Sequence, residues 1–227
     1  TGVQTCALPI CPSLISTTIT SSRIAALAGT NPSLRHAIRV GIAGAAQGYI
    51  GGKKTMTEKR LAYDYIVIEG NIGTGKTSLA TRLSDDFDTR LILERFADNP
   101  FLPKFYENQN RYAFPLELSF LADRYKQLKD DLANPELFRQ QTVSDYILSK
   151  SLIFAGITLK DDEFDLYQRL FDIINPNLPR PDLLVYLHKE VNILQRNIRS
   201  RGRDYEQNIQ DDYLKKLEEG YWNFFRQ

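Results

Sequence analysis

The chain has 227 residues, of which 42% are hydrophobic and 25% are charged, and its formal net charge is +1 at pH 7. This composition is typical of a globular domain that buries a core of its own. No run of 18 apolar residues is present, which argues against a membrane-spanning helix. A net charge this close to zero gives no overall positive potential that would attract nucleic acid or an anionic membrane. We therefore expect neither a nucleic-acid nor a membrane partner.

The first 55 residues differ from the rest of the chain. They contain no acidic residue, they hold both cysteines (Cys6 and Cys11), and the only methionine, Met56, follows them directly. Since the opening "TGVQTCALPI" resembles a translated library adaptor, we interpret 1–55 as a non-native or upstream extension with few contacts to a domain at 56–227. A transit peptide is the alternative, because the segment is rich in Ser and Thr and lacks acids. The absence of cysteine after Cys11 fits a reducing, cytoplasmic location.

Short apolar runs alternate with longer amphipathic stretches from Tyr65 onward. Runs rich in Val, Ile or Leu predict buried parallel strands at Tyr65–Glu69, Arg90–Glu94, Gln141–Asp145 and Leu183–Leu187. Apolar residues at helical spacing predict helices at Lys76–Phe87, Leu116–Leu132, Phe164–Ile174, Val191–Arg199 and Asp211–Phe225. This alternation predicts an α/β fold whose parallel sheet is covered by helices on both faces.

A glycine-rich loop follows the first predicted strand. Gly70, Gly75, Lys76 and Thr77 match the phosphate-binding pattern G-x-x-x-x-G-K-[ST], and a predicted helix begins at the lysine. Glycines let successive N–H groups converge on an anion, and the helix N-terminus favours negative charge. We therefore predict the P-loop NTPase fold, with ATP bound by Gly70, Asn71, Ile72, Gly73, Thr74, Gly75, Lys76, Thr77 and Ser78.

Two motifs that are absent from the sequence limit the classes of nucleotide-binding protein to which this chain could belong. No N-K-x-D motif for reading guanine follows the loop, and no apolar strand ends in Asp-Glu as in larger ATPases. We therefore expect a small kinase in which Lys76 binds the outer phosphates of ATP. Thr77 and Asp145, which ends the third predicted strand, would hold Mg²⁺.

Five motifs in order resemble the deoxyribonucleoside kinase family, and most closely its bacterial deoxyguanosine/deoxyadenosine kinase branch. They are "GNIGTGKTSLA", "DNPFLPKFYEN", "YAFPLELSFLADRYKQ", "SDYILSKSLIFA" and "RNIRSRGRDYE". The resemblance implies ATP-dependent phosphorylation of a deoxynucleoside 5′-hydroxyl in nucleotide salvage, commonly by a homodimer. It also implies a final strand after the last helix, which this chain would lack. The alternatives are a nucleoside-monophosphate kinase and an inactive nucleotide-binding protein.

The resemblance also assigns roles to individual residues. Glu94 matches the glutamate that receives the 5′-hydroxyl proton, whereas Tyr106 and Glu206 match groups that bind the 3′-hydroxyl. Arg199, Arg201 and Arg203 lie in an arginine-rich stretch that matches the lid over the ATP phosphates, and we expect Arg201 and Arg203 to be catalytic along with Lys76 and Glu94. Guanidinium groups suit this task because they match phosphate oxygens.

The resemblance implies that one helix reads the base, and Glu117 and Arg124 share a face of that helix with Phe120. The family commonly has glutamine where Glu117 stands. A carboxylate offers only acceptors, which complement the N1–H and 2-amino donors of guanine, so the sequence favours deoxyguanosine over deoxyadenosine. The family usually has arginine where this chain has Tyr146, so no arginine role transfers to that position, and Lys150 lies further along.

Overall fold

The computed structural model describes residues 23–28, 60–95, 99–133 and 141–226. Its strands are β1 (Arg23–Ala28), β2 (Tyr65–Gly70), β3 (Arg90–Ile92), β4 (Thr142–Ser144) and β5 (Leu183–His188). Its helices are α2 (Lys76–Phe87), α3 (Leu102–Glu107), α4 (Gln109–Ala133), α5 (Lys150–Thr158), α6 (Asp161–Ile174), α7 (Val191–Arg201) and α8 (Asp211–Arg226). Short 3-10 turns occur at Asn175–Asn177 and Asp204–Glu206.

The strands form one parallel sheet in the order β1-β5-β2-β4-β3, so the predicted α/β fold is confirmed. Every residue of β2, the strand before the glycine loop, is buried, as expected for a central strand covered on both faces. Because the strands are parallel, their carboxyl ends lie at one edge of the sheet, where ligands of such sheets bind.

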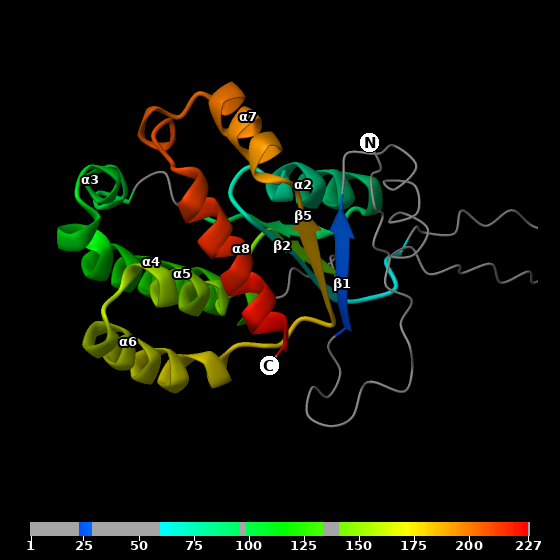
Figure 1. The fold of residues 1–227 in the computed structure, drawn as a ribbon. Helices are drawn as coiled ribbons and strands as arrows, with labels where there is room; N and C mark the ends of the chain where they lie inside the picture. The colour runs from blue at the N-terminus through cyan, green and yellow to red at the C-terminus, as the bar shows by residue number, and fades with distance from the viewer. Residues whose placement is uncertain (1–22, 29–59, 96–98, 134–140, 227) are drawn as a thin grey trace, which may run out of the picture.

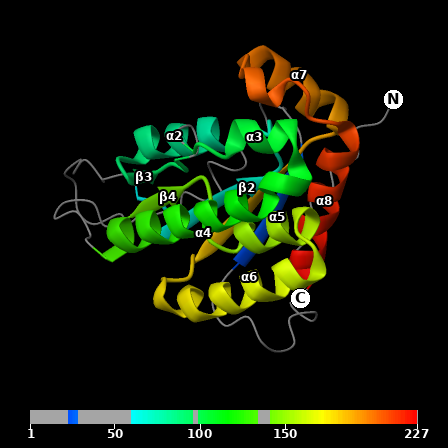
Figure 2. The ribbon, with the colours of Figure 1, turned by 90° about the vertical axis from the view of Figure 1, so that its left-hand side faces the viewer.

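Helices cover both faces of the sheet (Figures 1 and 2). Ile66 and Ile68 of β2 pack against Ala80 and Leu83 of α2 on one face. On the other face, β5 packs on α5 and α8 through a cluster that includes Leu184, Tyr186, Ile153 and Tyr221. Helix α6 packs on α4 and α5, outside the layer that covers the sheet.

The expectation that segment 1–55 makes few contacts with the domain is wrong for six residues. Strand β1 pairs in parallel with β5 from Arg23 opposite Leu183 to Ala28 opposite His188. It fills the edge position next to β5, because an uncovered edge of backbone N–H and C=O groups is a template for another strand. The rest of the segment lies outside the described residues, and its interpretation as an upstream extension stays a prediction.

The boundaries of several elements also differ from the sequence prediction. Helix α4 begins at Gln109 instead of Leu116 and runs across Pro115. Strands β3 and β4 end at Ile92 and Ser144, so Glu94 and Asp145 lie just beyond the strands that were expected to end with them. In the described part of the chain no strand follows α8.

Candidate active site

The glycine loop between β2 and α2 has the conformation that an anion-binding loop needs. Gly70, Gly73 and Gly75 all have positive φ, at 151°, 81° and 96°. A Cβ on Gly70 would lie 2.4 Å from the carbonyl oxygen of Leu187, so only glycine fits this close to β5. The N-terminus of α2 follows the loop directly, with Lys76 as its first residue.

Lys76 folds back over the loop. Its Nζ donates to the carbonyl oxygens of Gly70, at 2.8 Å, and Asn71, at 3.0 Å. Burial and the nearby charge of Lys150 lower the pKa of Lys76 to about 8, although Glu69 opposes the shift. Lys76 beside the loop and Lys150 at the start of α5 thus place two partly desolvated cations near each other, which suits a polyphosphate ligand.

Two asparagine side chains connect the loop to neighbouring helices. Asn71 Nδ2 donates to the carbonyl oxygen of Leu214 in α8, at 2.7 Å. From α7, Asn197 Nδ2 donates to the carbonyl oxygen of Gly73, also at 2.7 Å. The loop is therefore bonded to both helices that flank the predicted lid.

Asp145 connects this loop to Glu94. Its Oδ2 accepts a 2.6 Å hydrogen bond from Thr77 Oγ1, and its Oδ1 accepts a 2.8 Å bond from the backbone N–H of Glu94. The two residues predicted to hold a metal thus lie side by side at the carboxyl edge of the sheet. Ser78 is exposed in the same turn of α2.

Two cations hold the side chain of Glu94. Arg124 Nε and Nη2 lie 2.8 and 2.7 Å from Oε1, and Lys150 Nζ lies 2.6 Å from Oε2. Burial by itself would raise the pKa of Glu94, but Lys150 and Arg124 hold it well below its ordinary value. Glu94 is therefore a carboxylate over the whole physiological pH range.

Glu117 lies on the same face of α4 as Arg124, two helical turns before it. It is 2% exposed, and its Oε1 accepts a 3.1 Å hydrogen bond from Thr158 Oγ1 in α5. Burial raises its pKa to about 7, against the opposing charge of Arg124. Arg124 also donates to Ser151 Oγ at 2.8 Å, and its guanidinium lies 4.7 Å from the ring centre of Phe120.

A second group of predicted residues gathers where α3 meets the turn after α7. Glu206 is buried and forms ion pairs with Arg201 and, at 3.1 Å, with Arg203. Tyr106 stacks on Tyr205 with ring centres 6.2 Å apart. Because Tyr205 directly precedes Glu206, this stacking brings Tyr106 near Glu206, the other predicted sugar-binding residue. Burial, and then the charge of Glu206, raise the pKa of Tyr106.

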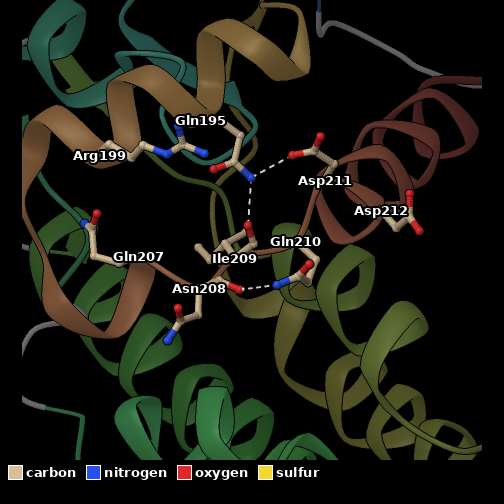
Figure 3. A pocket seen from close by; sticks show the side chains of 8 residues that line it. All are labelled: Gln195, Arg199, Gln207, Asn208, Ile209, Gln210, Asp211 and Asp212. Carbon is tan, nitrogen blue, oxygen red and sulfur yellow. Dashed lines mark hydrogen bonds between the residues drawn. The ribbon is translucent and has the colours of Figure 1, made fainter.

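A cavity of about 390 Å³ lies between α7 and the start of α8 (Figure 3). Of the three predicted lid arginines, only Arg199 lines it. The cavity wall is rich in amide and carboxylate side chains, namely Gln195, Gln207, Asn208, Gln210, Asp211 and Asp212. Gln195 Nε2 crosses it to the carbonyl oxygen of Ile209, at 2.7 Å, and to Asp211 Oδ1, at 2.9 Å. Arg199 is thus separate from the Arg201–Glu206–Arg203 group.

Sequence reasoning missed two buried polar residues of this site. Lys150 received no role, although it is the only charged residue between Asp145 and Lys160 and so stands out in an apolar stretch. Glu69 was taken only as the end of a strand, yet it is 1% exposed and accepts hydrogen bonds from Tyr221 and the N–H of Ile147. Tyr146 is fully buried in the core, with no hydrogen-bond partner for its hydroxyl among the described residues.

Comparison with known proteins agrees with this geometry. The sequence model of the deoxynucleoside kinase family matches residues 66–227. The chain is 39% identical over 157 residues to deoxyguanosine kinase of Bacillus subtilis (strain 168), covering 69% of this chain and 76% of that protein. It is 30% identical over 166 residues to the deoxyadenosine/deoxycytidine kinase of the same organism, covering 70% and 75%.

Among solved structures, deoxyadenosine kinase from M. mycoides with bound dATP has the same fold, with a TM-score of 0.63 and 22% identity. The match covers 71% of this chain and 83% of that one. In the described part of the chain no helix is both long and apolar enough to cross a membrane. The matched sequence, the fold and the site show that this chain belongs to the deoxynucleoside kinase family.

Proposed function

We propose that this deoxynucleoside kinase transfers the γ-phosphoryl group of ATP to the 5′-hydroxyl of a purine deoxynucleoside, and prefers deoxyguanosine to deoxyadenosine. The observation that carries the proposal is the buried carboxylate of Glu117, beside the Glu94–Arg124 ion pair. The reaction would return free nucleosides to the nucleotide pool, which is a salvage role.

The preference for guanine follows from the hydrogen-bonding capacity of Glu117. Thr158 occupies one position on Oε1, so the carboxylate keeps acceptor capacity on both oxygens. Guanine presents two adjacent donors, whereas adenine presents an acceptor beside a donor. A buried carboxylate therefore satisfies guanine and leaves a mismatch with adenine. The 39% identity to a deoxyguanosine kinase supports this choice.

Glu94 would orient the 5′-hydroxyl. A carboxylate with a strongly lowered pKa is a weak base. Phosphoryl transfer, however, depends mainly on how the nucleophile is positioned and little on the strength of the base. The sugar would be held at its 3′-hydroxyl by Tyr106 and Glu206, which already lie close together at the turn after α7. Since Arg201 and Arg203 pair with Glu206, sugar binding and lid position are linked.

ATP would be held by the backbone of the glycine loop and by Lys76, with Arg201 and Arg203 closing over its phosphates and Arg199 at the edge of the lid. Thr77 and Asp145 fit Mg²⁺, because both supply oxygen atoms and lie in hydrogen-bond contact. Mg²⁺ usually takes one or two protein ligands together with phosphate oxygens and water. When bound it would neutralise phosphate charge.

We also propose a homodimer formed through α4 and α6. Leu118 of α4 and Leu166 and Ile173 of α6 are large apolar side chains that are 36%, 42% and 69% exposed. Leu166 and Ile173 are seven residues apart, so they lie on the same face of α6. A second copy that covered them would bury this apolar surface.

The test is a comparison of kcat/KM for the four deoxynucleosides, with deoxyguanosine monophosphate as a further acceptor, in the unsubstituted protein and in Glu117→Gln. The amide puts a donor against a guanine donor, at a cost of about 1–3 kcal/mol, or roughly 5- to 150-fold in kcat/KM for deoxyguanosine. Deoxyadenosine should be affected less or should gain. The exposed Glu219→Gln is the matched control.

Three results would contradict the proposal. One is an initial preference for deoxyadenosine. Another is a purine ratio that Glu117→Gln does not move. The third is faster phosphorylation of the monophosphate than of any nucleoside, which would indicate a nucleoside-monophosphate kinase.

A further inference from the structure

Lys150 is a buried cation in an unfavourable place. Its side chain is 7% exposed, and it is the first residue of α5, where the helix dipole disfavours positive charge. The charge of Lys150 also acts on Lys76, a second cation. A residue that served packing alone would not need a charge here, and costly charges of this kind cluster at functional sites.

The two oxygens of Glu94 are not equally occupied. Oε1 accepts the hydrogen bond of Arg124 Nε, at 2.8 Å, and Arg124 Nη2 also lies 2.7 Å from it, so the guanidinium covers this oxygen. Oε2 receives Lys150 Nζ, which leaves one acceptor position. A nucleoside hydroxyl that bonds to Glu94 must therefore use Oε2, the same oxygen that Lys150 holds.

Two donors that share one carboxylate oxygen are neighbours. With hydrogen bonds of ordinary length and angle, the ammonium nitrogen and the hydroxyl oxygen would lie roughly 4–5 Å apart. An ammonium has three N–H groups, and Glu94 is the one side chain in the described ranges to which Lys150 Nζ is hydrogen bonded. Further N–H groups are thus positioned beside the attacking oxygen.

The charge of Lys150 reaches both halves of the site. It acts on Glu94 and Glu117 on the nucleoside side, and on Lys76 and Glu69 on the side of the glycine loop. Because Lys150 Nζ lies 2.6 Å from Oε2, a phosphoryl group transferred to a hydroxyl on Oε2 would come close to this ammonium.

We propose that Lys150 is a catalytic residue, whose ammonium stays bonded to Oε2 of Glu94 and donates a second hydrogen bond to the phosphoryl group in transfer. The proposal rests on the proposed function, since it takes Glu94 as the group that orients the 5′-hydroxyl. Lys150 would do two things at once: it keeps Oε2 in place for the nucleophile, and it stabilises the charge on the equatorial phosphoryl oxygens.

The step is an ordinary displacement. The 5′-oxygen forms a bond to the γ-phosphorus, while the bond from that phosphorus to the β–γ bridging oxygen breaks and its electron pair leaves with ADP. The hydroxyl proton passes by way of Oε2 to water. Nothing is oxidised or reduced.

The experiment compares Lys150→Met, Lys150→Gln and the exposed control Lys126→Met. The first measurement is kcat and KM for deoxyguanosine with ATP. The second is calorimetric binding of ADP and of the ATP analogue AMP-PNP, each with saturating deoxyguanosine, because the ratio of their affinities reports contact with the γ-phosphoryl group. Circular dichroism verifies that each variant is folded.

We expect Lys150→Met to lower kcat by about 10²- to 10³-fold, as loss of a transition-state donor does, with KM for deoxyguanosine changed less than about fivefold. The preference for AMP-PNP over ADP should fall relative to the unsubstituted protein and to Lys126→Met. Lys150→Gln keeps a hydrogen-bond donor for Glu94 but removes the positive charge. If Lys150→Met does not fold, the same two measurements on Lys150→Gln test the proposal.

A higher KM for deoxyguanosine with an unchanged AMP-PNP to ADP ratio would overturn the proposal, because Lys150 would then only position Glu94. A kcat within threefold of the unsubstituted protein would overturn it as well. If the unsubstituted protein phosphorylates no deoxynucleoside, the proposed function itself fails, which is a separate and distinguishable result.

Discussion

The phenol of Tyr221 in α8 donates a 2.8 Å hydrogen bond to Oε2 of Glu69, the buried glutamate that precedes the glycine loop. Glu69 Oε1 accepts the backbone N–H of Ile147, at 3.0 Å. One carboxylate therefore joins β2 to the last helix and to the segment that leads into α5. Burial raises the pKa of Glu69, and Lys150 and Lys76 oppose that shift.

Removal of the Tyr221 hydroxyl should destabilise the fold. Tyr221→Phe keeps the ring and leaves one buried oxygen of Glu69 without this donor, at a cost of about 1–3 kcal/mol. The measurement is the free energy of unfolding from urea titration. Tyr125→Phe, on the partly buried face of α4, is the control and should change little. Equal stability of the two variants would mean that the hydrogen bond contributes nothing.

Lys76→Ala should abolish phosphoryl transfer and leave the fold intact. The Nζ of Lys76 bonds only to loop carbonyls among the described residues, so its loss removes little packing. We expect a loss of at least about 10³-fold in kcat/KM. The exposed Lys216→Ala should keep full activity. Activity of Lys76→Ala within a few-fold of the unsubstituted protein would refute the phosphate-binding role of the loop.

Glu94→Gln should reduce both activity and stability. The amide cannot pair with Arg124 and Lys150 together, and breaking a buried ion pair typically costs about 3–5 kcal/mol. The pKa of Glu94 is lowered in the folded protein. Its contribution is therefore present above its unfolded pKa of about 4.3 and is lost as the pH falls below that value.

The pH dependence separates this effect from a general weakening of the core. Urea titrations between pH 3 and pH 7 should show a steeper loss of unfolding free energy on acidification for the unsubstituted protein than for Glu94→Gln. The exposed Glu107→Gln is the control. Parallel curves for all three proteins would show that Glu94 carries no such linkage.

Base choice should change with pH, because the pKa of Glu117 is raised to about 7. Above pH 7 the carboxylate complements guanine. Below it the protonated acid has a donor beside an acceptor, as an amide does, and complements adenine. Between pH 6 and pH 8 the ratio of kcat/KM for deoxyguanosine to that for deoxyadenosine should rise by up to about tenfold. In Glu117→Gln the ratio should be flat, and a ratio that rises equally in both proteins contradicts this role.

Ile173→Asp should weaken the proposed dimer. A charge on an apolar helix face that a second copy covers is desolvated without a partner. Sedimentation velocity of the unsubstituted protein should give a dimer and that of Ile173→Asp a monomer. Asn223→Asp, which adds one charge to the exposed side of α8, should stay dimeric. A monomeric unsubstituted protein would rule out the interface.

Local signals predicted the elements that carry the glycine loop. Helix α2 spans the predicted Lys76–Phe87 because its start is set by the loop itself. Helix α5 was not predicted, since the segment "SLIFAGIT" is apolar on most sides and has no helical periodicity. The predicted helix began at Leu116, from its apolar stripe, whereas α4 begins at Gln109 and accommodates Pro115.

The sequence indicated which residues belong to the site, but not which of them form ion pairs. The motif indicated Lys76 and Thr77, and the resemblance indicated Glu94 and Arg124. The sequence contained no sign that Glu94 would be shared by residues 30 and 56 positions away. Those pairings depend on the packing of α4 and α5 against the sheet, so the role of Lys150 emerged only from the fold.

The bonds from Asn71 to α8 and from Asn197 to α7 have a mechanical consequence. The segment between these two bonds carries Arg199, Arg201 and Arg203, so both of its ends are fastened to the glycine loop. Gly202 lies between the ends, with φ of 69° and nothing within 4 Å of an added Cβ. In its proposed role as a lid, the segment would move about Gly202 while both ends stay bonded to the loop.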